Sequence, residues 1–241
     1  GNINMYSGSI DLNTGDLVLT AGQTATDGII LVVRPITAGS VTAHADDSII
    51  LAGAVSTNSI STTVGLNSGV VQITNIGASA LTADVKNGSL TYISTGATTL
   101  NQVTGGTGSV TITAPSVNDH ASDTIADITA DTVSITGTSG IGNSAPVDIA
   151  SAAGITLIAT SGNIDVDHVA DASTTVSNIQ TGSGTVTFDQ TGNETLGITI
   201  ASTTNGTITV NNTGGTLTLG DLTAGGSGDL ALSTINSGNI A

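Results

Sequence analysis

A short pattern of apolar and polar positions recurs along the whole chain. It consists of a glycine, a small polar residue and then an apolar–polar–apolar triplet, and this period-two alternation is the signature of a β-strand with one buried face. In places an asparagine precedes the glycine, and such pairs favour tight turns with a positive φ. Copies of the pattern start at Gly8, Gly88, Gly108, Gly162, Gly184, Gly206 and Gly228. Since no stretch sustains a helical period, we expect an all-β fold.

The spacing of these copies predicts how the strands are arranged. The copies that start at Gly162, Gly184, Gly206 and Gly228 follow one another at equal intervals, and the step from Gly88 to Gly108 is slightly shorter. A period of about 20–22 residues with two or three short strands is what one coil of a parallel β-helix, or β-solenoid, requires. With such a period the chain makes roughly eleven coils. Each coil advances the axis by about 4.8 Å, so we expect a rod roughly 50 Å long.

The pattern indicates one continuous solenoid segment over residues 1–241. A loop is expected near residues 34–36, where a proline interrupts strand pairing. The other two prolines, Pro115 and Pro146, indicate a larger loop within residues 113–146. The strand pattern is still running at both ends of the sequence. We therefore expect the assembled object to be longer, either through further repeats or through copies stacked end to end.

The composition narrows the picture of the core. Aromatic residues make up 1% of the chain and charged residues 8%, while 38% is hydrophobic. A wide globular core needs large side chains at its centre. Small and β-branched side chains can instead fill a thin core between two closely spaced walls. The composition therefore favours a long, narrow object over a globular domain.

The charge balance limits the possible partners and the location. The formal net charge is −16, and Arg34 and Lys86 are the two basic residues. So few cations exclude nucleic acid and an anionic membrane surface as partners. The longest apolar run, residues 29–33, is too short to span a bilayer. The chain has no cysteine, which excludes disulfides and thiolate metal sites. These features agree with a protein that works outside the cell.

Glycine-led strand strings such as those at 154–157 and 161–166, Asn-Gly turns, missing cysteines and scarce aromatics characterise most of this chain. In these features the chain resembles the repeat regions of filamentous-haemagglutinin-like exoproteins and autotransporter passenger domains. The resemblance implies a right-handed parallel β-helix, secretion by a Gram-negative-type cell, and a role in adhesion or filament building.

Acidic residues gather in two places and predict a cation site. One group contains Asp119, Asp123, Asp127 and Asp131, and the other contains Asp165, Asp167 and Asp171. Calcium takes six to eight oxygen ligands from carboxylates and carbonyls, and the turns of a β-solenoid offer both. The nonapeptide of the best-known calcium-binding solenoids does not occur. Five of these aspartates are therefore candidate calcium ligands, with a solvated acidic face as the alternative: Asp119, Asp123, Asp165, Asp167 and Asp171. We expect no other cofactor.

The three histidines share a local context. His44, His120 and His168 each precede an aspartate by three residues. Imidazole and carboxylate together suit zinc or nickel, but one histidine per site is too few for tight binding of such metals. We therefore expect these residues to lie in related turns of the repeat, facing water.

The function that these features favour is structural. We expect a structural or adhesive segment of a secreted or cell-surface fibrous protein, and no enzyme. The alternative is a self-assembling extracellular filament or sheath subunit whose copies stack end to end or laterally. A third hypothesis is a carbohydrate-active β-helix with a groove of carboxylates near Asp165 and Asp167, although three aromatic residues are few for binding sugars. The expected partners are further copies of the chain, or glycans or proteins of a cell surface.

Overall fold

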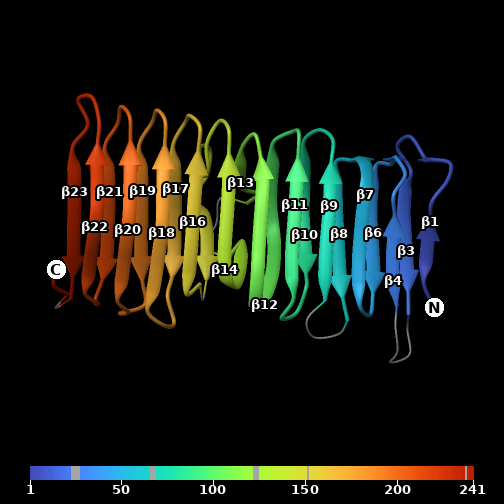
Figure 1. The fold of residues 1–241 in the computed structure, drawn as a ribbon, viewed down its shortest axis with the longest axis horizontal. Helices are drawn as coiled ribbons and strands as arrows, with labels where there is room; N and C mark the ends of the chain where they lie inside the picture. The colour runs from blue at the N-terminus through green and yellow to red at the C-terminus, as the bar shows by residue number, and fades with distance from the viewer. Residues whose placement is uncertain (23–27, 66–68, 122–124, 151, 237) are drawn as a thin grey trace.

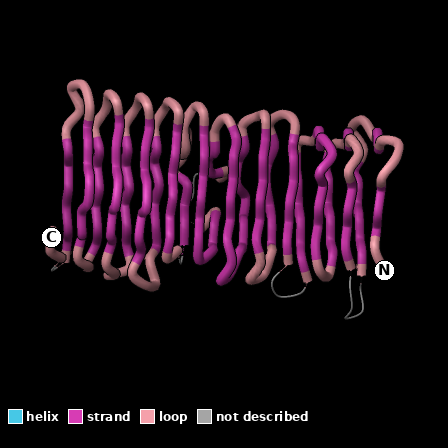
Figure 2. Tube along the Cα trace, viewed as in Figure 1, coloured by secondary structure: helices cyan, strands magenta, loops and turns pink. Residues whose placement is uncertain are grey.

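Parallel strands stacked as successive coils make up this structure, which is a computed structural model. The structure describes residues 1–22, 28–65, 69–121, 125–150, 152–236 and 238–241. Within these ranges there is no helix, and the strands form a β-solenoid of about ten turns. Figure 1 and Figure 2 show the coils side by side along the longest axis, with the two ends of the chain at opposite ends of the stack. The predicted all-β parallel β-helix is therefore confirmed.

The described residues form 23 strands. In chain order they are β1 (Ile3–Met5), β2 (Ile10–Asp11), β3 (Asp16–Ala21), β4 (Ile29–Val32), β5 (Ile36–Thr37), β6 (Ser40–Ala45), β7 (Ser48–Ser56), β8 (Ser59–Val64), β9 (Val70–Asn75), β10 (Ser79–Asp84), β11 (Ser89–Ser94), β12 (Thr98–Ala114), β13 (Val117–Asp119), β14 (Ile128–Gly137), β15 (Val147–Ala150), β16 (Gly154–Ala159), β17 (Ile164–Val169), β18 (Thr174–Thr181), β19 (Val186–Thr191), β20 (Leu196–Thr203), β21 (Ile208–Thr213), β22 (Leu217–Ala224) and β23 (Leu230–Ile235).

The strands are arranged on two long faces. The first face contains β1, β4, β7, β9, β11, the later parts of β12 and β14, and then β16, β18, β20 and β22. The second face contains β3, β6, β8, β10, the early part of β12, β13, the start of β14, and then β15, β17, β19, β21 and β23. In the first coils a short strip of β2, β5 and the end of β7 forms the corner that leads from the first face to the second.

The core follows from alternation and register. In β16 every second residue is buried, as the sequence pattern predicts for a strand with one face inside. The strands pair in parallel, and inward residues of one coil lie beside inward residues of the next. Equivalent residues of successive coils are therefore stacked. One inward column on the first face is aliphatic throughout: Ile3, Ile30, Ile49, Val71, Leu90, Val110, Val133, Ile155, Val176, Ile198 and Leu219. Each coil therefore buries its apolar side chains mainly against its two neighbours.

The strand register also gives the length of the repeat. Ile164 pairs with Val186, and Val186 pairs with Ile208, so these later coils have the period that the glycine spacing predicts. Earlier coils are less uniform: the step from Asp16 to its partner Ser40 is longer, and the step from Ser40 to its partner Ser59 is shorter. Both turns and strands contribute to the difference, since β7 has nine residues and β9 has six.

The glycines of the repeat have a role that the sequence did not indicate. Of the glycines that start the pattern, Gly8, Gly162 and Gly184 have the positive φ of a tight turn, whereas Gly206 and Gly228 do not. A Cβ atom on Gly228 would overlap the carbonyl oxygen of Gly206, and one on Gly206 would overlap that of Gly184. Glycine is needed here because the turns of successive coils pack backbone against backbone.

The two regions in which the sequence predicts loops both contain residues outside strands. Near 34–36 the chain turns from β4 into β5. Within 113–146 the coil continues through β13 and β14, so the segments outside strands lie mainly on either side of β14. Across the described residues we find no helix that is long and apolar enough to cross a membrane.

Candidate functional site

The five aspartates predicted to bind calcium do not form one group. Asp119 ends β13 and is buried, whereas Asp165 and Asp167 are half-buried on the outward side of β17. Asp171 is exposed in the bend that follows β17, and Asp123 lies outside the described residues. The carboxyl groups that come together include Asp127, which belongs to the first acidic group but is not among the five predicted ligands, and Asp148, which the sequence did not indicate.

A buried cluster forms where β13, β14 and β15 meet. Asp119, Asp127 and Asp148 each place one carboxylate oxygen within 4.8 Å of the other two. Asp127 is 1% exposed. Its Oδ2 atom accepts a hydrogen bond of 3.0 Å from the backbone N–H of Asp148, and Oδ1 of Asp119 accepts one of 2.8 Å from the N–H of Ala121. These backbone donors fix the orientation of two of the three carboxyl groups.

The electrostatics of this cluster follow from its burial. Burial raises the pKa of Asp127 to about 8, and the nearby charges of Asp119 and Asp148 act in the same direction. The hydrogen bond from the backbone N–H of Asp148 lowers the pKa, but by less than burial raises it. Asp127 is therefore mostly protonated at neutral pH, since a group is protonated below its pKa.

The cluster continues outward as a stack of carboxyl groups on successive coils. Asp127 and Asp148 are neighbours across the coil boundary, Asp148 pairs with Asp167, and Asp167 pairs with Asp189. We call these four residues the acid ladder. On the next coil Asn211 takes the same position, and its Nδ2 atom donates a hydrogen bond of 2.6 Å to Asp189. Neighbouring strands lie about 4.8 Å apart, so the ladder holds like charges at close range.

The acid ladder borders a hollow on the second face. A space of about 390 Å³ is lined by Asp148, Asp167 and Asp189, with Val169 and Thr191 beside them. Burial raises the pKa of Asp167, and the charge of Asp189 raises it further. Burial also raises the pKa of Asp165, with contributions from Asp167 and Asp189. These shifts have the direction expected when carboxylates are desolvated and crowded together.

The ladder can relieve its repulsion in two chemically different ways. Some carboxyl groups can hold protons, as the raised pKa values indicate, or a hard cation can bind between them. Carboxylate and backbone oxygens are the ligands that calcium prefers, so the donor set of Asp119, Asp127 and Asp148 fits calcium. The calcium hypothesis stays a prediction, now with Asp127 and Asp148 among its ligands. The carbohydrate-active hypothesis also stays a prediction, and its expected groove of carboxylates corresponds to the hollow beside Asp167.

The histidines do not share one environment. His44 lies within β6 and His168 within β17, and His168 is 1% exposed. The expectation of a water-facing turn is wrong for His168, because alternation within the strand directs it into the core. His44 lies in a strand but on its outward side, and His120 is exposed in a bend, as expected. Its Nδ1 atom is 3.1 Å from Oε1 of Gln190, and Gln190 donates to Asn212 at 3.1 Å. Burial lowers the pKa of His168, despite the opposing hydrogen bond with Gln190.

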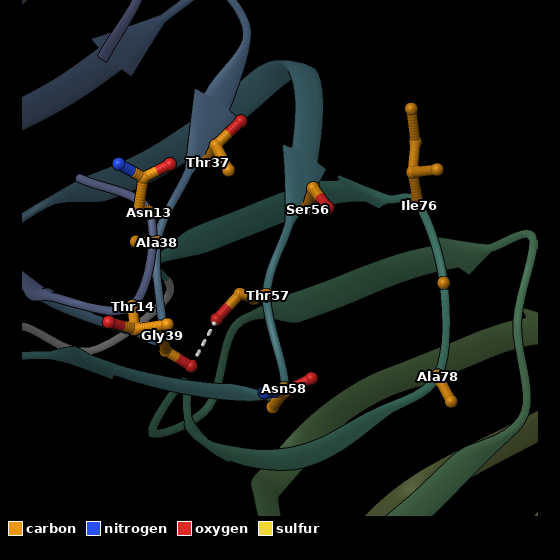
Figure 3. A pocket seen from close by; sticks show the side chains of 11 residues that line it. Asn13, Thr14, Thr37, Ala38, Gly39, Ser56, Thr57, Asn58, Ile76 and Ala78 are labelled. Atoms are coloured by element: carbon orange, nitrogen blue, oxygen red, sulfur yellow. Dashed lines mark hydrogen bonds between the residues drawn. The ribbon is translucent and has the colours of Figure 1, made fainter. Parts of the chain in front are cut away.

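A second hollow lies at the corner of the first four coils and contains no carboxyl group among the described residues that line it. It has a volume of about 370 Å³. Figure 3 shows two rows of side chains with a floor between them. One row consists of Thr37, Ser56 and Ile76, the other of Thr14, Asn58 and Ala78, and the floor includes Ala38 and Thr57. We call this feature the corner groove.

The corner groove arises from a change in the width of the coils. Leu51 pairs with Ile73, but Val55 pairs with Asn75, so β7 uses two more residues than β9 to cover the same distance. The earlier coils therefore extend farther at this corner. The floor is fixed by the buried hydroxyl of Thr57, which donates hydrogen bonds to the carbonyl oxygens of Gly39 at 3.0 Å and Ser59 at 3.1 Å.

A smaller hollow extends the corner groove along the stack. It has a volume of about 260 Å³, shares Asn58 and Ala78 with the groove, and reaches Ala97 and Thr99 on the next coil. Neither hollow can be predicted from the sequence, because serine, threonine and asparagine are common throughout the chain and no spacing marks the residues that line the hollows. The change of coil width at β7 is visible only in the strand register.

Comparison with protein-family models, curated proteins and solved structures finds no match for this chain. The β-solenoid architecture is established by the strand pairing, whereas membership of the filamentous-haemagglutinin-like or autotransporter group stays a prediction.

Proposed function

We propose that the chain is a structural segment of a secreted or cell-surface fibrous protein, and that it acts as a rod that presents adhesive elements at a distance from the cell. The observation that supports this is the unbroken aliphatic column from Ile3 to Leu219, carried by parallel strands on every coil. A stack of this kind has a length set by the number of coils, since each coil adds about 4.8 Å.

The surface chemistry supports the same role. A net charge of −16 keeps neighbouring rods apart in solution and protects exposed strand edges from non-specific pairing. An extended surface protein needs this protection because its β-structure is exposed along its whole length.

The proposal can be tested on cells that produce the parent protein. Antibodies against residues 1–241 are expected to label the outside of the cell in immuno-electron microscopy. Removing these residues from the parent gene is expected to lower attachment of the cells to surfaces. Replacing them with an unrelated solenoid of equal coil number is the matched control, and it should restore the distance at which distal elements are displayed. Labelling confined to the cell interior would contradict the proposal.

A second candidate function is a filament subunit whose copies stack end to end. It rests on the parallel pairing of successive coils through backbone hydrogen bonds, as between β21 and β23, because a coil of one copy can pair with a coil of another in the same way. Sedimentation of the purified chain at rising concentration, with and without calcium, is expected to show growing assemblies. A monomer at every concentration would remove this candidate.

A further inference from the structure

We propose that the corner groove is a binding site for a neutral glycan chain that lies along the axis of the stack. The inference deepens the proposed function, on whose adhesive part it rests, by naming the site and the chemical class of the partner.

The first support is the set of free polar groups that line the groove. The side chains of Asn13, Thr37, Ser56 and Asn58 are exposed, and none makes a hydrogen bond to another described residue. Each of these amide and hydroxyl groups offers both a donor and an acceptor. Sugar hydroxyls need this mixture, because each of them also donates and accepts.

The second support is the distribution of charge. None of the described residues that line the corner groove or its smaller extension is ionisable, although the chain carries a net charge of −16. The surrounding negative field repels uronic acids, sialic acids and phosphorylated sugars. A neutral saccharide meets no such repulsion, and the uncharged lining holds no cation that would select an anionic one.

The third support is an apolar surface beside the polar groups. Ile76 is 46% exposed at the end of one wall, and its side chain projects away from the backbone in Figure 3. Pyranose rings have faces of C–H groups, and burying these against an aliphatic side chain is favourable. Because Ile76 offers less area than an aromatic ring, we expect weak single-site binding that becomes strong when many rods bind together.

The geometry favours a chain rather than a single sugar. Thr37 pairs with Ser56 on the next coil, so two hydroxyls lie about 4.8 Å apart along the axis. The extension past Asn58 to Thr99 continues in the same direction. The two volumes, about 370 and 260 Å³, together lie within the usual range for ligand sites. The hydrogen bonds of Thr57 fix the floor, so binding costs little conformational entropy there.

The test uses the whole 241-residue chain and defined probes. Neutral tetrasaccharides of glucose, N-acetylglucosamine and mannose, and tetragalacturonate as the anionic probe, are titrated into isotope-labelled protein and followed by NMR shifts. We expect at least one neutral probe to shift residues of the corner groove and tetragalacturonate to leave them unchanged. The double variant Ser56→Ala/Asn58→Ala should weaken binding by about tenfold, the effect of losing one or two hydrogen bonds.

The matched control is Ser183→Ala/Thr204→Ala, which removes two exposed hydroxyls from the same corner on later coils and should leave binding unchanged. The inference is overturned if no neutral probe binds, if the shifts map elsewhere, if the groove variant binds like the unaltered chain, or if only the anionic probe or a peptide binds there. Small-angle X-ray scattering on the same samples, together with the surface labelling described above, reports on the proposed rod separately. If the rod is displayed on the cell but binds no glycan, glycan binding in the corner groove is refuted and the proposed structural function is unaffected.

Discussion

The corner groove and the acid ladder are built in the same way and differ in chemistry. The groove and the hollow beside the ladder have similar volumes, about 370 and 390 Å³, and the residues that line each of them come from successive coils. In the groove the stacked positions hold hydroxyl, amide and aliphatic groups, and in the ladder they hold carboxyl groups. Parallel stacking can therefore repeat the chemistry of one position on several successive coils. Stacked neutral groups do not repel one another. Stacked charges do, and their repulsion must be balanced by protons or cations.

The largest expected effect concerns the pH dependence that this balance creates. The pKa of Asp127 is raised to about 8 in the folded chain, against about 3.9 when unfolded. The folded state therefore binds more protons, and its advantage is complete below about pH 4 and is lost as the pH rises through about 8. We expect the free energy of unfolding to fall by several kcal/mol over this interval. Urea denaturation at a series of pH values measures it.

The substitution Asp127→Asn is the control for this prediction. The amide keeps an acceptor for the N–H of Asp148 and cannot ionise. We expect the variant to lose most of the slope with pH and to be more stable than the unaltered chain in alkaline solution. Equal slopes in the two proteins would show that Asp127 does not dominate the titration.

The next effect in size is that of calcium. If the cluster of Asp119, Asp127 and Asp148 binds the ion, calcium at about ten times its dissociation constant should add about 1.4 kcal/mol to the free energy of unfolding. Thermal unfolding with calcium and with a chelator measures the difference, and Asp148→Asn should abolish it. The absence of any shift at millimolar calcium would mean that protons alone balance the cluster.

A smaller effect is expected in the middle of the ladder. Asp167→Asn removes one of three adjacent half-buried charges, so it should stabilise the chain by about 0.5 kcal/mol at low salt. Salt should diminish this gain, because screening weakens repulsion in both proteins. Asp229→Asn, at an exposed position before β23, is the control and should change little. A loss of stability in Asp167→Asn would contradict this prediction and would indicate that the charge of Asp167 helps to bind a cation.

The smallest effect is expected in the corner groove. Ser56→Ala/Asn58→Ala removes exposed groups without partners among the described residues, and such changes usually alter stability by less than about 0.5 kcal/mol. Denaturation in urea measures this. A clear loss of stability would show that Ser56 and Asn58 support the corner. The contrast between neutral stacked groups, which leave stability unchanged, and charged ones, which alter it, would then be wrong.

The sequence predicted the architecture because each strand carries its own signal. Alternation in segments such as 164–169 marks inward and outward residues, and the step from Gly162 to Gly184 gives the length of a coil. The alignment of side chains between coils could not be predicted, because the number of residues per coil varies. The step along the chain from Asp167 to Asp189 is longer than the step from Asp148 to Asp167, so a fixed period cannot align the three carboxyl groups. The groove depends on a two-residue difference between β7 and β9, which no local pattern reveals.

The stacking of coils also has a mechanical consequence. The hydrogen bonds between strands run along the axis of the rod, and each coil is bonded to its two neighbours. A pulling force along the axis therefore loads one coil boundary at a time rather than the whole sheet in shear. Each late coil, such as the one from Val186 to Ile208, would release roughly 75 Å of extended chain as it peels away. Under tension the rod would lengthen in repeated steps and absorb energy at each of them.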